Sequence, residues 1–225
     1  MKKPACQAAR APKKPSRACL GKFLKSYKGL EDIHLPLFRE VQRIAKPRSV
    51  LYPGSYWHLT ASLVFCKVLY VDCDSKVGRF FEDPALLDWV KEHKDYASIP
   101  EIDYRQQTFE SLSLAEKGFD LLISMSAGII SKPCGRFVKR GGYFLVSDAH
   151  FDARTTALDP RFELVAVYNP ETKRLEKKGL ESCFMTTAGE KISAAQVKAS
   201  ISKPKGSRGF KLKREDWFHL FKRVR

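Results

Sequence analysis

Residues 49–72 read SVLYPGSYWHLTASLVFCKVLYVD and set the pattern of the fold. Ser49 to Tyr52 is predicted as a short strand that ends at Pro53-Gly54, and the residues after this turn are predicted as a helix. Val68 to Val71 is an unbroken apolar run, which is typical of a parallel strand covered on both faces. This order of strand, turn, helix and strand predicts an α/β domain.

The same alternation runs through the middle of the chain. A helix is predicted over Ser75 to Tyr96, with Pro84 either kinking it or starting a second segment. The next predicted elements are a weak strand over 105–109, a buried strand over 119–124, a short helix over 133–140 ended by Gly141-Gly142, and a strand over 143–146. With a helix in two pieces over Leu20 to Ala45, they predict a Rossmann-like three-layer sandwich around a mostly parallel sheet.

The pattern changes after Asp159-Pro160. Residues 162–168 and 182–187 are predicted as an antiparallel strand pair at the C-terminal edge of the sheet. Residues 190–225 are predicted as a basic linker followed by an amphipathic helix, because Trp217, Leu220, Phe221 and Val224 recur at helical spacing. That segment would either pack on the domain or contact a membrane or a partner. The expected domain is therefore 21–189, after a disordered basic tail over 1–20.

The charge of the chain lies mainly at its two ends. The protein has 225 residues and a formal net charge of +16, yet residues 31–197 together are close to neutral. The basic tails could add weak affinity for RNA, DNA or another anionic surface. The N-terminal tail has no apolar run of a secretory signal, although a transit peptide is an alternative.

The cysteines and the hydropathy predict a cytoplasmic protein. The six cysteines form no C-x-x-C pair, so no metal site is predicted; buried thiols in a reducing compartment are expected, with a catalytic Cys/His pair as the alternative. No apolar run approaches the roughly 18 residues that a membrane span needs.

The turn at Gly54 and the acid at Asp72 mark the predicted ligand site. Ligands of open α/β sheets bind at the carboxyl ends of the strands, beside the first strand. The turn lacks the second and third glycines of G-x-G-x-x-G, which disfavours a nicotinamide or flavin dinucleotide. Asp72 follows Gly54 by 18 residues and could accept the hydroxyls of an adenosine ribose, with Asp74 as a near substitute. Alternatively, both acids cap the next helix.

Two further segments carry a family resemblance. Residues 118–128 read GFDLLISMSAG, and residues 139–148 read KRGGYFLVSD. This order resembles the fourth strand, fourth helix and fifth strand of class I S-adenosylmethionine-dependent methyltransferases, whose helix ends in L-K-P-G-G. The resemblance covers about residues 35–187, and the first glycine loop departs from the family pattern E/D-x-G-x-G-x-G.

The resemblance implies S-adenosylmethionine as the cofactor. Tyr52, Gly54 and Ser55 would line its methionine side, and Asp72, or Asp74, would bind the ribose. The segment from Gln107 through Thr108 and Phe109 would approach the adenine. Ser124 and Ser126 would face both the cofactor and the methyl acceptor.

The implied reaction is methyl transfer to a small molecule or a macromolecule that the sequence does not identify. A general base assists when the acceptor loses a proton. His58, Asp148 and His150 are the candidates, with capping or loop roles as the alternative. A non-catalytic Rossmann-like protein that holds RNA or DNA through its basic tails is the competing hypothesis. Ser55 lacks the G-x-S-x-G elbow of a hydrolase nucleophile.

Overall fold

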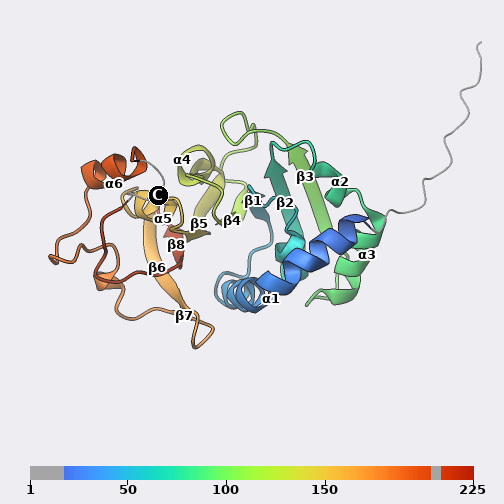
Figure 1. Ribbon diagram of the computed structural model, residues 1–225, viewed down its shortest axis with the longest axis horizontal. Helices are drawn as coiled ribbons and strands as arrows, with labels where there is room; N and C mark the ends of the chain where they lie inside the picture. The colour runs from blue at the N-terminus through green and yellow to red at the C-terminus, as the bar shows by residue number, and fades with distance from the viewer. Residues whose placement is uncertain (1–17, 204–208) are drawn as a thin grey trace, which may run out of the picture.

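The computed structural model describes residues 18–203 and 209–225 (Figure 1). Most of the tail predicted as disordered, residues 1–17, and residues 204–208 of the basic linker lie outside the described residues. The first element is α1 (Ala18–Ala45), a single helix of 28 residues that contains Pro36. The prediction of two pieces is therefore wrong. Leu37 and Phe38, directly after the proline, are fully buried, so packing compensates for the hydrogen bond that proline cannot donate.

Eight strands form one sheet in the order β3-β2-β1-β4-β5-β8-β6-β7. Five strands are parallel to one another: β1 (Val50–Pro53), β2 (Lys67–Asp72), β3 (Glu101–Gln106), β4 (Phe119–Ser124) and β5 (Val138–Ser147). The strand order reverses between β1 and β4, which is the position where α/β sheets bind ligands. The predicted Rossmann-like sheet is confirmed.

The C-terminal edge of the sheet is antiparallel, as expected. It comprises β6 (Phe162–Asn169), β7 (Arg174–Glu176) and β8 (Phe218–Arg223). The expected partner of β6 was wrong, because β6 pairs with β7 and β8. Residues 182–187 instead follow the short helix η3 (Leu180–Ser182), and Met185 and Thr186 form isolated bridges to Lys191 and Leu212.

The prediction of a C-terminal amphipathic helix is wrong. The segment forms β8, which lies between β5 and β6 and is antiparallel to both. His219, Leu220 and Phe221 are consecutive and all buried, because elements cover both faces of the sheet there. A short apolar run that is buried on both faces has no alternating pattern, so its periodicity cannot distinguish a strand from a helix.

The helices lie on both faces of the sheet (Figure 1). One core cluster joins the sheet to α1, η1 (Leu59–Leu63), α2 (Gly78–Phe81) and α3 (Pro84–His93). The other joins it to α4 (Ser131–Cys134), η2 (Gly135–Phe137), α5 (Asp152–Ala157) and α6 (Ala194–Ile201). The three-layer arrangement is confirmed.

The structure tests the predictions made from Pro84 and from Gly141-Gly142. Pro84 starts a second helix, α3, whose cap Asp83 accepts hydrogen bonds from the backbone of Ala85 and Leu86. The helix expected to end at Gly141-Gly142 is shorter, and both glycines lie inside β5. A Cβ on Gly142 would lie 2.9 Å from the Asp120 carbonyl oxygen, beside the register shift between β4 and β5. The glycine therefore permits a close approach of two strands.

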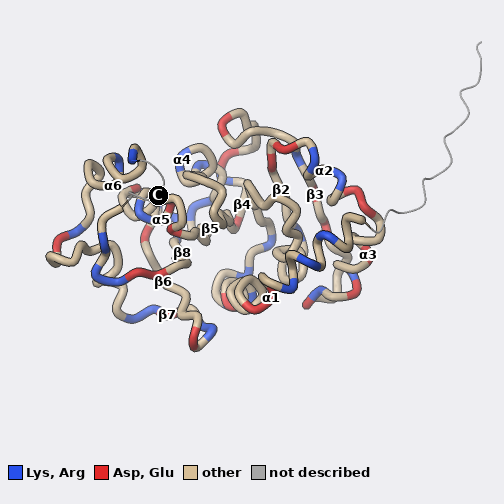
Figure 2. Tube along the Cα trace, in the orientation of Figure 1, with Lys and Arg blue, Asp and Glu red and all other residues tan. Residues whose placement is uncertain are grey.

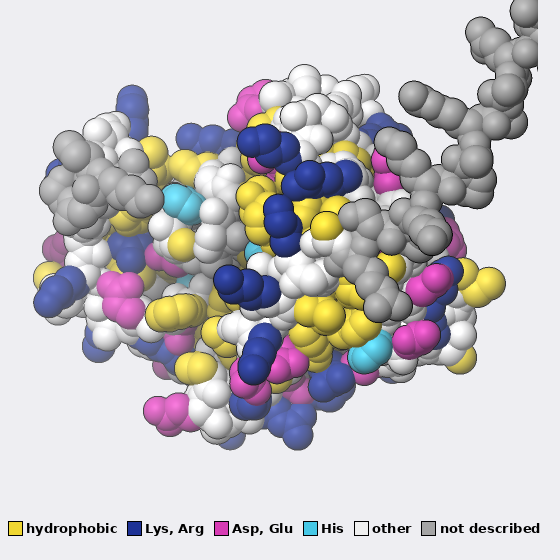
Figure 3. Space-filling view, turned by 45° about the vertical axis from the view of Figure 1, so that its right-hand side comes forward, with side chains coloured by type: hydrophobic (Ala, Val, Ile, Leu, Met, Phe, Trp, Pro, Cys, Tyr) yellow, Lys and Arg dark blue, Asp and Glu magenta, His cyan; other side chains and the backbone are white. Residues whose placement is uncertain are grey.

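Both signs of charge are interspersed along the described chain (Figure 2). On one face, Lys and Arg side chains form a band across the middle of the molecule, with hydrophobic side chains beside it (Figure 3). Within the described segments, no helix combines the length and apolarity needed to cross a membrane.

The central position of β8 can be tested by mutation. Phe221→Ala is expected to lower the free energy of unfolding by about 3–5 kcal/mol, because it empties a fully buried site in the sheet. The matched control is Trp217→Ala, just before β8, where the side chain is 74% exposed. This substitution should change the free energy of unfolding by less than about 0.5 kcal/mol. Chemical denaturation measures both; equal effects would contradict this placement.

Candidate functional site

The turn after β1 is hydrogen-bonded to the end of β2. The Gly54 backbone nitrogen donates to the Val71 carbonyl at 2.7 Å. The Asp72 carboxylate accepts from the backbone nitrogen of Tyr56 at 3.2 Å and from that of Asp74 at 2.9 Å. Tyr56 has a left-handed backbone, with φ of 54°. Asp72, which is only 9% exposed, thus stabilises a strained turn. Asp74 accepts from the backbone nitrogen of Lys76 and closes the following turn.

Gly54 lies against two other loops at the carboxyl ends of the parallel strands. Its φ is +66°, and a Cβ added there would be 2.2 Å from Cβ of Ala127, in the loop after β4. The same Cβ would be 3.2 Å from Cζ of Phe109, in the loop after β3. Only glycine fits this position, and the space above it is taken by residues of the protein itself.

The other residues predicted near the cofactor make local contacts. Tyr52 is buried in the core with its ring against Tyr70, and burial raises the pKa of its hydroxyl. The hydroxyl of Ser55 donates to the Tyr56 carbonyl. Thr108 bonds to Ser111 within its own turn at 2.9 Å.

A buried carboxylate, Asp152, organises the loop after β4. Sequence reasoning missed it, because Asp148, which directly follows β5, was the more obvious acid. Asp152 is 1% exposed and accepts from the Ser124 hydroxyl at 2.8 Å and from the backbone nitrogens of Ile130 and Ser131. Burial raises its pKa, and these hydrogen bonds oppose the shift. The hydroxyl of Ser124, predicted to face ligands, is bonded to this carboxylate.

Asp148 is bound to Arg154, and His150 follows it on the same loop. The Arg154 guanidinium lies 2.6 Å from the Asp148 carboxylate and 3.2 Å from that of Glu215. Burial raises the pKa of Asp148, although Arg154 partly offsets this. The ion pair connects the loop after β5 to the segment that precedes β8. His150 is half-buried and does not line the pocket described next.

A pocket of about 470 Å³ opens beside these loops. The ends of β4 and β5 contribute Ser126, Ser147 and Asp148, and Trp217 and Phe218 form the opposite wall. The Ser147 hydroxyl accepts from the backbone nitrogen of Ser126 at 2.9 Å. Helix α1 covers the pocket with Leu30, Ile33 and His34. We refer to this cavity as the α1 pocket.

Two histidines meet between the Gly54 turn and the α1 pocket. The ring centroids of His34 and His58 are 6.4 Å apart. His34, which sequence reasoning missed, bonds through Nδ1 to the Thr60 hydroxyl at 3.2 Å. Burial and the neighbouring His58 lower the pKa of His34 to about 4, and burial also lowers the pKa of His58. Both rings are therefore neutral near pH 7.

The lowered pKa of His34 predicts a pH dependence of stability. Below pH about 6.5 the unfolded chain gains a proton at His34 that the folded state rejects until about pH 4. Stability should thus be lost as the pH falls through this window, by up to about 3 kcal/mol from this group. In His34→Gln, whose side chain can still bond to Thr60, the free energy of unfolding should fall less steeply as the pH is lowered. Denaturation curves recorded at several pH values measure this dependence. Equal slopes in both proteins would contradict the shift.

No protein-family model matches this chain, and no curated protein matches it. Solved structures do resemble it. Geranyl diphosphate methyltransferase in complex with SAM aligns with a TM-score of 0.53 and 14% identity, over 91% of this chain and 90% of that one. The chain has a class I methyltransferase-like fold.

Two other structures align less closely. A cofactor-bound protein from MTB, Rv0187, aligns with a TM-score of 0.48 and 12% identity, over 92% of this chain and 89% of that one. The YcgJ protein from Bacillus subtilis aligns with a TM-score of 0.38 and 21% identity, over 50% of this chain and 50% of that one. The alignment therefore spans half the length of that protein.

The residues at this turn have the chemistry that binding of S-adenosylmethionine needs, but they leave no free space for it over Gly54. A carboxylate at the end of β2 is the acceptor that ribose hydroxyls require, and Asp72 retains lone pairs beyond the two that it uses. The space over Gly54, however, is filled by Ala127 and Phe109. Cofactor binding at this turn therefore requires these two side chains to move.

Proposed function

We propose that the protein is an S-adenosylmethionine-dependent methyltransferase whose acceptor occupies the α1 pocket. The observation that carries the proposal is that Asp72 at the end of β2 and the α1 pocket at the ends of β4 and β5 lie on one edge of a methyltransferase-like sheet. Asp72 would hold the ribose, Thr108 and Phe109 would approach the adenine, and Ser126 would lie between cofactor and acceptor. S-adenosylmethionine, when bound, would supply an electrophilic methyl group.

His34 is the proposed proton acceptor of this reaction. It lines the α1 pocket, and its bond to Thr60 through Nδ1 leaves Nε2 for a ligand. A neutral imidazole can accept the proton that a hydroxyl or amine acceptor loses. His58 would position His34, whereas Asp148 is better suited to hold Arg154 than to act as a base. The free thiols among the described cysteines support a reducing compartment such as the cytoplasm.

Calorimetry with S-adenosylmethionine and S-adenosylhomocysteine tests the proposal. The wild-type protein should bind both, and Asp72→Asn should weaken binding about tenfold or more, as expected for losing a charged hydrogen-bond acceptor. Asp74→Asn is the matched control: it removes the same charge two residues away and should leave affinity nearly unchanged. If the wild type binds neither compound at millimolar concentration, the proposal is rejected.

The contact over Gly54 predicts a gain of affinity on mutation. Ala127→Gly removes the methyl group that fills the turn and should tighten S-adenosylhomocysteine binding about fourfold, the equivalent of one buried methyl group. Ser126→Gly, at the adjacent left-handed residue with φ of 64°, should not produce this gain. Titration of the three proteins under one condition compares them. Unchanged affinity in Ala127→Gly would show that this side chain does not limit entry.

The filled turn also favours a second candidate function. In that case the protein keeps the fold without methyl transfer and holds RNA or DNA through its basic tails, parts of which lie outside the described residues. Failure of both the wild type and Ala127→Gly to bind cofactor supports this alternative. It further requires nucleic-acid binding with a steep salt dependence that is lost when residues 1–17, which precede α1, are removed.

A further inference from the structure

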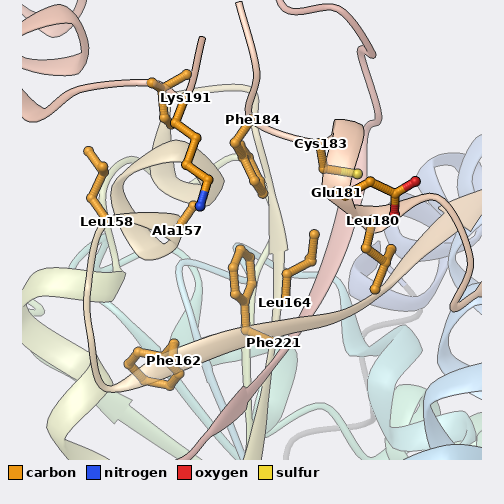
Figure 4. A pocket seen from close by; sticks show the side chains of 11 residues that line it. Ala157, Leu158, Phe162, Leu164, Leu180, Glu181, Cys183, Phe184, Lys191 and Phe221 are labelled. Atoms are coloured by element: carbon orange, nitrogen blue, oxygen red, sulfur yellow. The ribbon is translucent and has the colours of Figure 1, made fainter. Parts of the chain in front are cut away.

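A second pocket lies on the other side of β8. Its volume is about 280 Å³, and it shares no lining residue with the α1 pocket. Its walls are apolar side chains from β6, β8, the end of α5 and the segment after β7 (Figure 4). They include Leu158, Leu164, Leu180, Phe184, Ile192 and Phe221. We refer to this cavity as the β6 pocket.

The outer wall of the β6 pocket is a small hairpin. The backbone nitrogen of Ile192 donates to the Phe184 carbonyl at 3.0 Å, and that of Thr186 donates to the Glu190 carbonyl at 2.7 Å. Phe184 has a left-handed backbone with φ of 56°, and its ring stacks on Phe221 with centroids 5.9 Å apart. The hairpin thus holds one aromatic wall against the sheet.

Lys191, an exposed residue of the hairpin, supplies a charge at the edge of this apolar cavity. In Figure 4 its side chain extends between Phe184 and Leu158, with the amine near Ala157. No carboxylate among the described residues forms an ion pair with this amine. The one acid of the lining, Glu181, lies on the opposite side of the pocket, beside Leu180 and Cys183 (Figure 4). A cation beside apolar walls favours an anionic ligand that also has an apolar part.

We propose that the β6 pocket binds a medium-chain aliphatic carboxylate. The carboxylate pairs with Nζ of Lys191, and the chain lies against Phe184, Phe221 and Leu164. The cavity volume of about 280 Å³ leaves room for an aliphatic chain of several methylene groups. Charge and shape together select an acid over an amine or an alcohol of equal length. This site is independent of the proposed methyl transfer.

Titration of the full-length protein with octanoate, followed by calorimetry, tests this site. Octanoate should bind at least tenfold more tightly than acetate, which lacks the chain, and than octylamine, which has the opposite charge. Lys191→Met should weaken octanoate binding at least tenfold, because it keeps most of the length of the side chain and removes its charge. Lys178→Met, an exposed lysine outside the pocket lining, is the matched control and should bind octanoate like the wild type.

A second variant tests the apolar part of the pocket. Leu180→Trp enlarges a half-buried side chain at the rim and should obstruct the chain of octanoate while leaving Lys191 in place. Asp72→Asn should leave octanoate affinity unchanged, which separates this site from the cofactor site. The proposal is overturned if octanoate does not bind at millimolar concentration, if octylamine binds equally well, or if Lys191→Met binds octanoate as tightly as the wild type.

Discussion

Strand β8 links the parts of this molecule that lie far apart in the sequence. Its backbone pairs with β5 on one side and β6 on the other, so that among the described strands β8 connects the antiparallel edge to the parallel part of the sheet. Its side chains also build both cavities, since Phe218 lines the α1 pocket and Phe221 lines the β6 pocket. Both cavities therefore depend on this strand being in register.

Buried carboxylates organise the carboxyl edge of the sheet. Asp72 binds two backbone amides around the Gly54 turn, Asp152 binds two more in the loop after β4, and Asp148 binds Arg154. Each fixes a loop at the end of a different strand. The edge is therefore preorganised, and entry of a ligand at Gly54 would require Ala127 and Phe109 to move.

Much of the sheet could be predicted from local sequence, but less of the site. Apolar runs such as Val68 to Val71 identify parallel strands, and Pro84 starts a helix, because both signals act within a few residues. Gly54 and Asp72 were also predictable, since the ends of neighbouring parallel strands meet. His34 and Asp152 were not, because their importance comes from partners that other elements bring to them.

The sequence by itself determined the order of the parallel strands and of the helices between them, the turn at Gly54 and the acid that faces it. These depend on apolar periodicity and on backbone conformations that few residues adopt. Only the tertiary structure decided that the last segment is a strand, that the Gly54 turn is filled by Ala127, and that Lys191 stands beside an apolar cavity. Each of these depends on contacts between distant residues, and burial on both faces erases the periodicity from which a sequence reveals a strand.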